Sequence, residues 1–249
     1  MDKPFSPIHS SAISQLGNCI DECQDTEEIR ALRKEEMDYS SLVKLGKLLS
    51  FSLRYREAIE EYKKALEIEP QRLEIHRLLA GRYLSTLQSD KAIEEFSWCL
   101  ENGGEEVDCH YRKGLAFYYK GDYKKAKEEF ESVIDKADPE MEVALIYWHT
   151  LSSLRLGEEG KLLSRPISLD KVGHHRSYFE SVSFLRGEIS ESEFRKMAEK
   201  ESCDMEYSMK IYALFVTNKD PADLKSILKR DEYWFCFSSL ASWCDNLSI

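Results

Sequence analysis

The sequence predicts an all-α protein, an α-solenoid built from antiparallel helix hairpins. The evidence is a period of 34 residues. Small residues recur at Ala58, Ala92 and Ala126. An aromatic ring follows each of them by four residues, at Tyr62, Phe96 and Phe130. A second series of small residues has the same period, at Gly46, Ala80 and Gly114. A constant period of this length is typical of stacked helical repeats.

Each feature of the period has a physical reason. Small residues at positions such as Gly46 and Ala58 allow the two helices of a hairpin to approach closely. Rings such as Tyr62 fill the space between one hairpin and the next, because a single helical hairpin cannot bury its apolar face alone. The pattern therefore predicts three hairpins in a row over residues 39–138, each stacked on the next.

The small, aromatic and small residues at these offsets resemble the tetratricopeptide repeat over roughly residues 39–157. The resemblance implies a right-handed superhelix whose concave surface is lined by the first helix of each repeat. Members of this family bind proteins or peptides on that surface. It therefore implies a protein-binding or peptide-binding scaffold or adaptor, with no catalytic residues and no cofactor.

The remaining sequence divides around the repeats. Residues 1–37 predict a helical cap, with helices from Ser10 to Cys23 and after Asp25. Residues 38–157 contain the three repeats and the first helix of a fourth, Met141 to Leu156. Residues 158–176 predict a degenerate helix and a loop. Residues 177–249 predict divergent hairpins that continue the same solenoid.

Capping residues mark the helices of the last segment. Ser190 with Glu193 three residues later forms a capping-box pattern. Asp220 followed by Pro221 marks another helix start, because proline suits the first helical position. An aromatic terminal helix is expected from about Tyr233 to Trp243.

Composition excludes several partner classes. The chain of 249 residues has a formal net charge of -11, whereas nucleic-acid binding requires a basic surface. Anionic membranes are disfavoured for the same reason. A basic peptide is compatible with this charge, as is an acidic surface that only maintains solubility. The chain lacks an N-terminal signal pattern and an apolar stretch of about 18 residues, so we expect a cytoplasmic protein.

The sequence offers no pattern for catalysis or metal binding. Seven scattered cysteines suit a reducing compartment. Cys19 and Cys23 lie one helical turn apart, but no further pair completes a zinc site. His76 and His110 occupy equivalent repeat positions, and we interpret both as packing residues with a polar tip.

The family resemblance assigns the peptide-binding groove to the first helices of the repeats. Gly81 lies at a further groove-facing position, on the first helix of the second repeat. The groove residues are Val43, Lys47, Phe51, Arg77, Leu84, Tyr111, Leu115, Tyr118 and Tyr119. Aromatic and arginine side chains are frequent anchors in such sites. The alternative is that several of these rings pack on neighbouring helices.

One subclass of the family binds chaperone C-terminal tails through a clamp of lysine, asparagine and arginine residues. The matching positions here are Val43, Lys47, Leu78, Asp108 and Arg112. Arg112 alone keeps the type of residue that the clamp requires, so chaperone-tail binding is not expected.

The aromatic terminal helix supports a second hypothesis, a homodimer formed through Trp234, Phe237 and Trp243. Solenoid caps usually expose a polar outer face, so an aromatic face indicates a covered surface. The alternative is that this helix folds back on Tyr207, Tyr212 and Phe215. A third hypothesis is a peptide-sensing regulator, although residues 1–37 are too short and too acidic for an effector domain.

Overall fold

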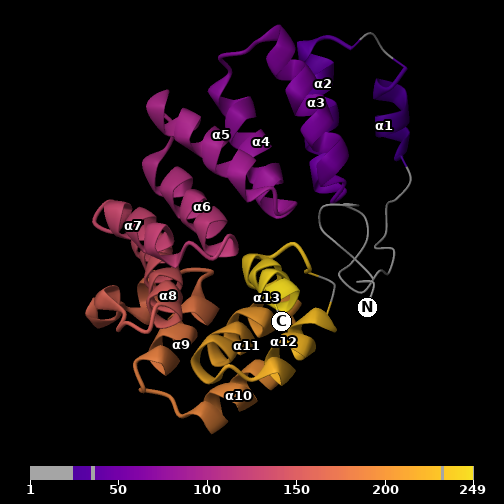
Figure 1. Ribbon diagram of the computed structural model, residues 1–249. Helices are drawn as coiled ribbons and strands as arrows, with labels where there is room; N and C mark the ends of the chain where they lie inside the picture. Colours follow the sequence, from indigo (N-terminus) through magenta and orange to yellow (C-terminus); the bar gives the residue numbers. More distant parts are fainter. Residues whose placement is uncertain (1–24, 35–36, 231–232, 249) are drawn as a thin grey trace. The chain divides into compact units, whose positions relative to one another are not determined.

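The computed structural model describes residues 25–34, 37–230 and 233–248, and all regular structure within these ranges is helical (Figure 1). The expected helix from Ser10 to Cys23, with Cys19 and Cys23, lies outside the described residues. The chain divides between Glu105 and Glu106 into two compact units.

The first unit contains a short cap and two hairpins. Its helices are α1 (Glu27–Leu32), α2 (Tyr39–Phe51), α3 (Tyr55–Ile68), α4 (Leu73–Ser85) and α5 (Ser89–Glu101). Helix α2 packs on α3, α3 on α4 and α4 on α5. This is the packing that the 34-residue period predicts for repeated hairpins.

The second unit contains the third hairpin and the divergent helices. Its helices are α6 (Glu106–Tyr119), α7 (Tyr123–Val133), α8 (Pro139–Arg155), α9 (Arg176–Leu185), α10 (Glu191–Glu199), α11 (Asp204–Asn218), α12 (Pro221–Leu228) and α13 (Phe237–Ser248). Two 3-10 helices, η1 (Lys161–Ser164) and η2 (Leu169–Lys171), lie in the segment expected to be degenerate. That one solenoid continues through both units stays a prediction.

Close packing of a ring on a glycine joins the two helices of a hairpin. A Cβ added to Gly46 would lie 2.7 Å from Cδ1 of Tyr62, and one added to Gly114 would lie 2.8 Å from Cζ of Phe130. Both rings are fully buried. The rings therefore occupy the space that a side chain at either glycine would need, as the sequence period predicts.

The turns inside the hairpins share an unusual backbone conformation. Leu53 and Leu87 have φ values of 58° and 56°, and Gly121, at the equivalent position of the third repeat, has 78°. This left-handed region is unfavourable for leucine. The backbone bonds from Arg54 N to Leu49 O (2.8 Å) and from Gln88 N to Tyr83 O (2.9 Å) close the same turn in the first two repeats.

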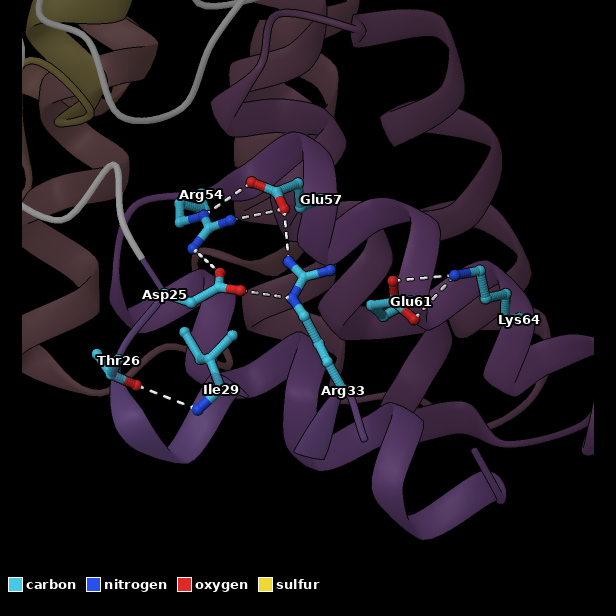
Figure 2. A network of polar contacts seen from close by, with 8 residues as sticks. All are labelled: Asp25, Thr26, Ile29, Arg33, Arg54, Glu57, Glu61 and Lys64. Carbon is cyan, nitrogen blue, oxygen red and sulfur yellow. Dashed lines mark hydrogen bonds and ion pairs between the residues drawn. The ribbon is translucent and has the colours of Figure 1, made fainter. Parts of the chain in front are cut away.

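A network of four charged side chains attaches α1 and the residues before it to the first hairpin (Figure 2). The guanidinium of Arg54 lies 2.6 Å from Asp25 and 2.7 Å from Glu57. Arg33 closes the network at 3.0 Å from Asp25 and 2.8 Å from Glu57. The two arginines lower the pKa of Asp25 and of Glu57 despite the opposing effect of burial. Helix α1 is thus held on the first hairpin by charge as well as by the buried side chains of Ile29 and Leu32, and its role as a cap stays a prediction.

Helix α8 forms the centre of the second unit. Its residues from Val143 to Ser153 are all buried, and it contacts α6, α7, α9 and α11. Asp138 caps its first turn by accepting a hydrogen bond from Met141 N at 2.8 Å. Two further caps follow the sequence patterns, because Ser190 Oγ accepts from Glu193 N at 3.3 Å and Asp220 accepts from Ala222 N at 2.9 Å.

His149 places an ionisable ring in this core. Its side chain is fully buried and its Nε2 lies 2.8 Å from Oε1 of Glu131. Burial lowers the pKa of His149 by more than the contact with Glu131 raises it. The neutral imidazole is therefore the form that the folded unit favours.

The glycine contacts predict opposite effects for two similar substitutions in the first unit. Gly46→Ala should lower the free energy of unfolding by about 1–3 kcal/mol, because the added methyl group displaces the Tyr62 ring. Gly81→Ala is the matched control, since a Cβ there meets no atom within 4 Å; it should raise the same free energy by about 0.5–1 kcal/mol. Urea unfolding followed by circular dichroism measures both, and equal effects would contradict the packing argument.

The His149 environment predicts a pH-dependent stability. The folded-state pKa of His149 lies below the usual value near 6.5, so protonation of this residue favours the unfolded chain. The free energy of unfolding should therefore be highest above about pH 6.5 and decrease as the pH falls, with His149 as the source of this dependence. His149→Gln should remove it, so the difference in melting temperature between the two proteins should change between about pH 5 and 7. A difference that stays constant across that range would show that His149 does not couple protonation to folding.

Candidate functional site

An ion pair defines the surface that the first helices of the first unit present. Lys47 Nζ on α2 lies 2.6 Å from Oε1 of Glu74 on α4. Phe51 lies one helical turn after Lys47, and Arg77 and Gly81 lie one and two turns after Glu74. We call these residues, Lys47, Phe51, Glu74, Arg77 and Gly81, the α2–α4 face.

An exposed aromatic ring is the main feature of this face. Phe51 is 88% exposed, the largest value among the exposed large hydrophobic residues that the structure describes. Val43 is half-buried, Lys47 and Arg77 are exposed, and Leu84 is fully buried. Gly81 is buried, although a methyl group added there would meet no atom within 4 Å. The face thus combines an exposed apolar ring with the Lys47–Glu74 ion pair and an exposed arginine.

The groove residues of the third repeat lie elsewhere, in the interior of the second unit. Tyr111, Leu115, Tyr118 and Tyr119 on α6 are all less than 9% exposed. Helices α8 and α13 pack against α6, and Tyr119 Oη donates a hydrogen bond to the carbonyl of Phe237 at 3.1 Å. Contact between a peptide and these side chains stays a prediction, and it requires α13 to leave α6.

Further hydrogen bonds fix the tyrosines of α6. The hydroxyl oxygens of Tyr111 and Tyr178 are 3.1 Å apart, and Tyr212 Oη donates to Tyr118 Oη at 3.1 Å. Burial raises the pKa of Tyr111, Tyr118 and Tyr119. These hydroxyls are therefore neutral hydrogen-bonding groups near neutral pH.

Arg155 lies beside these tyrosines and was not predicted as a site residue. Its guanidinium pairs with the carboxylate of Asp245 on α13 and donates to Tyr212 Oη at 3.2 Å and to Tyr118 Oη at 3.4 Å. It also lies 5.1 Å from the ring centre of Phe215. Burial raises the pKa of Asp245 although Arg155 opposes that shift. We call Tyr118, Arg155, Tyr212 and Asp245 the Arg155 cluster.

A cavity of about 80 Å³ adjoins the Arg155 cluster. Its lining includes Tyr118, Tyr123, Tyr212, Cys244 and Asp245. Burial raises the pKa of the Cys244 thiol to about 12, so this sulfur is not a nucleophile near neutral pH.

A larger open cavity of about 750 Å³ lies among α8, the η1 segment and the end of α9. Its cations already have partners. Lys161 lies 3.1 Å from Glu131, Arg165 lies 2.8 Å from Glu142, and Arg186 Nε donates to the carbonyl of Leu163 at 2.7 Å. This pairing leaves the cavity without a clear preference for one class of ligand.

The terminal helix packs within the second unit, and a homodimer formed through Trp234, Phe237 and Trp243 stays a prediction. Trp234 is fully buried, Trp243 is 3% exposed, and α13 packs on α11, α12 and α6 (Figure 1). The fold-back on the hairpin of Tyr212 and Phe215 is thus the arrangement observed. Helix α13 begins at Phe237, later than the expected start near Tyr233, and it continues to Ser248 past the expected end. Asp245 lies in this continuation, where Arg155 and Tyr212 hold it.

The remaining candidates have structural roles. His76 and His110 each place Nδ1 2.6 Å from a glutamate of the following helix, Glu95 and Glu129 respectively, as expected for packing residues with a polar tip. Arg112, the remaining clamp residue, pairs with Asp108 at 2.7 Å. No group of three potential metal ligands occurs among the described residues. Over the same part of the chain, none of the helices has the length and apolar character that crossing a membrane requires.

Comparison with known proteins agrees with the repeats. The tetratricopeptide repeat family model matches residues 39–72 and 107–135, and no curated protein matches. A solved structure titled "Structure of phAimR-Ligand" is similar at 15% sequence identity over 92% of this chain and 70% of that chain, with a TM-score of 0.48.

The family model leaves out residues 73–106, where the structure contains the helix pair α4 and α5 between the two matched repeats. The predicted middle repeat is therefore present as a helix hairpin. The two matched segments, which share the small-residue and aromatic contacts, are therefore tetratricopeptide repeats.

Proposed function

We propose that the protein is a non-enzymatic scaffold that binds a protein or peptide segment through its tetratricopeptide repeats. The general support is that stacked helical repeats provide extended binding surfaces instead of a reaction centre. The single observation that carries the proposal is Phe51, an aromatic side chain 88% exposed on the first helix of the first repeat.

The chemistry of the α2–α4 face supports binding of an extended or helical segment. Exposed aromatic rings act as anchors because they bury a large apolar area when a partner covers them. Lys47 and Glu74, paired at 2.6 Å, lie on the same face and supply polar groups for the rim of a bound segment.

The groove residues of the third repeat do not test this proposal well. Tyr111 and Tyr118 are buried and hydrogen-bonded to Tyr178 and Tyr212. Replacing both with alanine removes core packing in the second unit, so weaker partner capture would not distinguish lost binding from lost stability. Phe51 avoids this difficulty because little of its side chain is buried.

Phe51→Ala should abolish most partner capture and leave the fold intact. Truncation of an interface anchor commonly costs 2 kcal/mol or more, which corresponds to at least a ~30-fold loss of affinity. Proteins that copurify with the tagged full chain would be quantified by mass spectrometry for wild type and variant. Melting temperatures of the two proteins should agree, because an exposed side chain contributes little to stability.

Ile68→Ala is the matched control. Ile68 is 52% exposed and lies at the end of α3, a second helix of the same unit. It should retain every partner that wild type captures. Equal capture by Phe51→Ala and wild type would remove the α2–α4 face from the proposal, and equal losses in both variants would indicate nonspecific apolar adhesion.

A further inference from the structure

A cavity of about 240 Å³ lies between the second helices of the first two repeats, α3 and α5. It belongs to the first unit and shares no residue with the α2–α4 face. Its volume is below the roughly 300–1,000 Å³ of pockets for drug-sized ligands, so it suits one small chemical group. The lining consists of Arg56, Ile59, Glu60 and Lys63 of α3, Tyr83 of α4, and Gln88 and Lys91 at the start of α5.

Arg56 brings a cation without a partner to this cavity. Its Nε is buried and has no hydrogen-bond partner, and Arg56 forms no ion pair with any residue that the structure describes. Burial lowers the pKa of Arg56, because desolvation disfavours the charged form, yet an arginine stays protonated near neutral pH. Buried charges in proteins are normally paired. The missing partner is therefore an anion that the chain itself does not supply.

Two lysines add positive charge to the same lining. Lys63 Nζ lies 3.0 Å from Glu60, the carboxylate of the lining. Lys91 Nζ lies 3.0 Å from Oε1 of Gln88 and 5.3 Å from the ring centre of Tyr83, and both of these neighbours are uncharged. The lining thus has three cations and one carboxylate, a formal charge of +2 on a chain whose net charge is -11.

Other carboxylates near the cavity do not enter its lining. Burial raises the pKa of Tyr83, and the carboxylates of Glu95, Glu60 and Glu94 raise it further. Glu95 contacts His76 Nδ1 at 2.6 Å, and neither Glu94 nor Glu95 lines the cavity. The hydroxyl of Tyr83 is therefore protonated near neutral pH and is available as a hydrogen-bond donor.

The first turn of α5 also favours an anion at this place. Gln88, its N-cap residue, makes no side-chain capping hydrogen bond. At the equivalent position of the third repeat, Asp122 caps α7 by accepting a hydrogen bond from Lys125 N at 3.2 Å. Asp90 of α5 lies outside the cavity lining. Because the first N–H groups of a helix have no intrahelical acceptors, an uncapped start attracts negative charge.

The repeat period shows that the hairpins do not need these cations for packing. The residues 34 positions after Arg56 and Lys63 are Asp90 and Ser97. Helix α5, which carries them, packs on α4 as α3 packs on α2. A carboxylate and a hydroxyl thus replace the two cations in the next repeat without loss of the hairpin, which leaves the charges at Arg56 and Lys63 available for a ligand.

We propose that this cavity binds a phosphate group, with Arg56 as its main contact and Lys63 and Lys91 beside it. The planar guanidinium presents paired donors that match two phosphate oxygens, and the lysines act as point charges. A phosphate monoester carries a charge of about -1.5 to -2 at neutral pH, which matches the lining better than the single charge of a carboxylate. The group belongs either to a free phosphate compound or to a phosphorylated side chain of a partner.

Isothermal titration calorimetry on the full chain at constant ionic strength tests the site. The probes are inorganic phosphate, acetate and an alanine pentapeptide with phosphoserine at its centre. Arg56→Gln should weaken binding of the phosphate probes at least about tenfold, since it removes a charge-assisted paired contact. Acetate should bind wild type at least about tenfold more weakly than phosphate. Tighter binding of the peptide than of inorganic phosphate indicates a phosphorylated side chain, and equal or weaker binding indicates a free compound.

Lys44→Gln is the matched control. Lys44 is an exposed cation of α2 that pairs with Glu28 at 2.9 Å and lies outside the cavity. This variant should bind phosphate as wild type does. The melting temperature of Arg56→Gln without phosphate should not fall below that of wild type, because the substitution removes a desolvated charge that has no partner.

A second measurement uses the wild-type chain alone, so it remains decisive if Arg56→Gln does not fold. Saturating phosphate should slow acetylation of Lys63 and Lys91 by an activated acetate ester several-fold and leave that of Lys44 unchanged. Peptide mapping by mass spectrometry separates the three lysines.

Three results would overturn the proposal. One is that neither phosphate probe binds wild type more tightly than it binds Arg56→Gln. Another is acetylation of Lys63 and Lys91 that does not respond to phosphate. The third is acetate binding as tight as phosphate binding, which would assign the cavity to carboxylates. These measurements report only on this cavity, so their failure leaves the capture experiment on Phe51 unaffected.

Discussion

The repeats depend on the contact between an aromatic ring and a helix position without a side chain. The rings of Tyr62 and Phe130 occupy the space beside Gly46 and Gly114, where a Cβ would fall within 3 Å of ring carbons. This contact sets how closely the two helices of a hairpin approach. It also directs larger residues of the first helix, such as Lys47 and Phe51, away from the hairpin. The exposed face that we propose for binding is therefore a consequence of the packing that holds each hairpin together.

Local patterns in the sequence were sufficient to predict much of the fold. The three hairpins, the presence of α8 and the caps at Ser190 and Asp220 depend on residues within one or two turns of each other; α8 begins at Pro139, two residues before its expected start at Met141. The left-handed conformations of Leu53 and Leu87 could not be predicted in this way, because the glycine that favours such a turn is present only at Gly121. In the first two repeats, the flanking helices impose the conformation on leucine.

Contacts between residues far apart in the chain account for most of the site that was not predicted. Tyr119 and Phe237 are 118 residues apart, and Arg155 and Asp245 are 90 apart. A repeat period locates the residues on a first helix but does not reveal which later helix covers them. Asp245 also lay beyond the expected end of the terminal helix, so no pattern connected it with Arg155. The two units thus differ in what they offer: Phe51 is exposed in the first, whereas Tyr111 and Tyr118 are covered in the second.

Site-specific photo-crosslinking tests the central claim most directly. A benzophenone amino acid placed at position 51 of the full chain would react with any segment bound on the α2–α4 face, and the same group at position 68 provides the reference. We predict that captured proteins crosslink from position 51 and not from position 68. Crosslinking of the same proteins with equal yield from both positions, or from position 68 alone, would contradict the assignment of binding to the first helices.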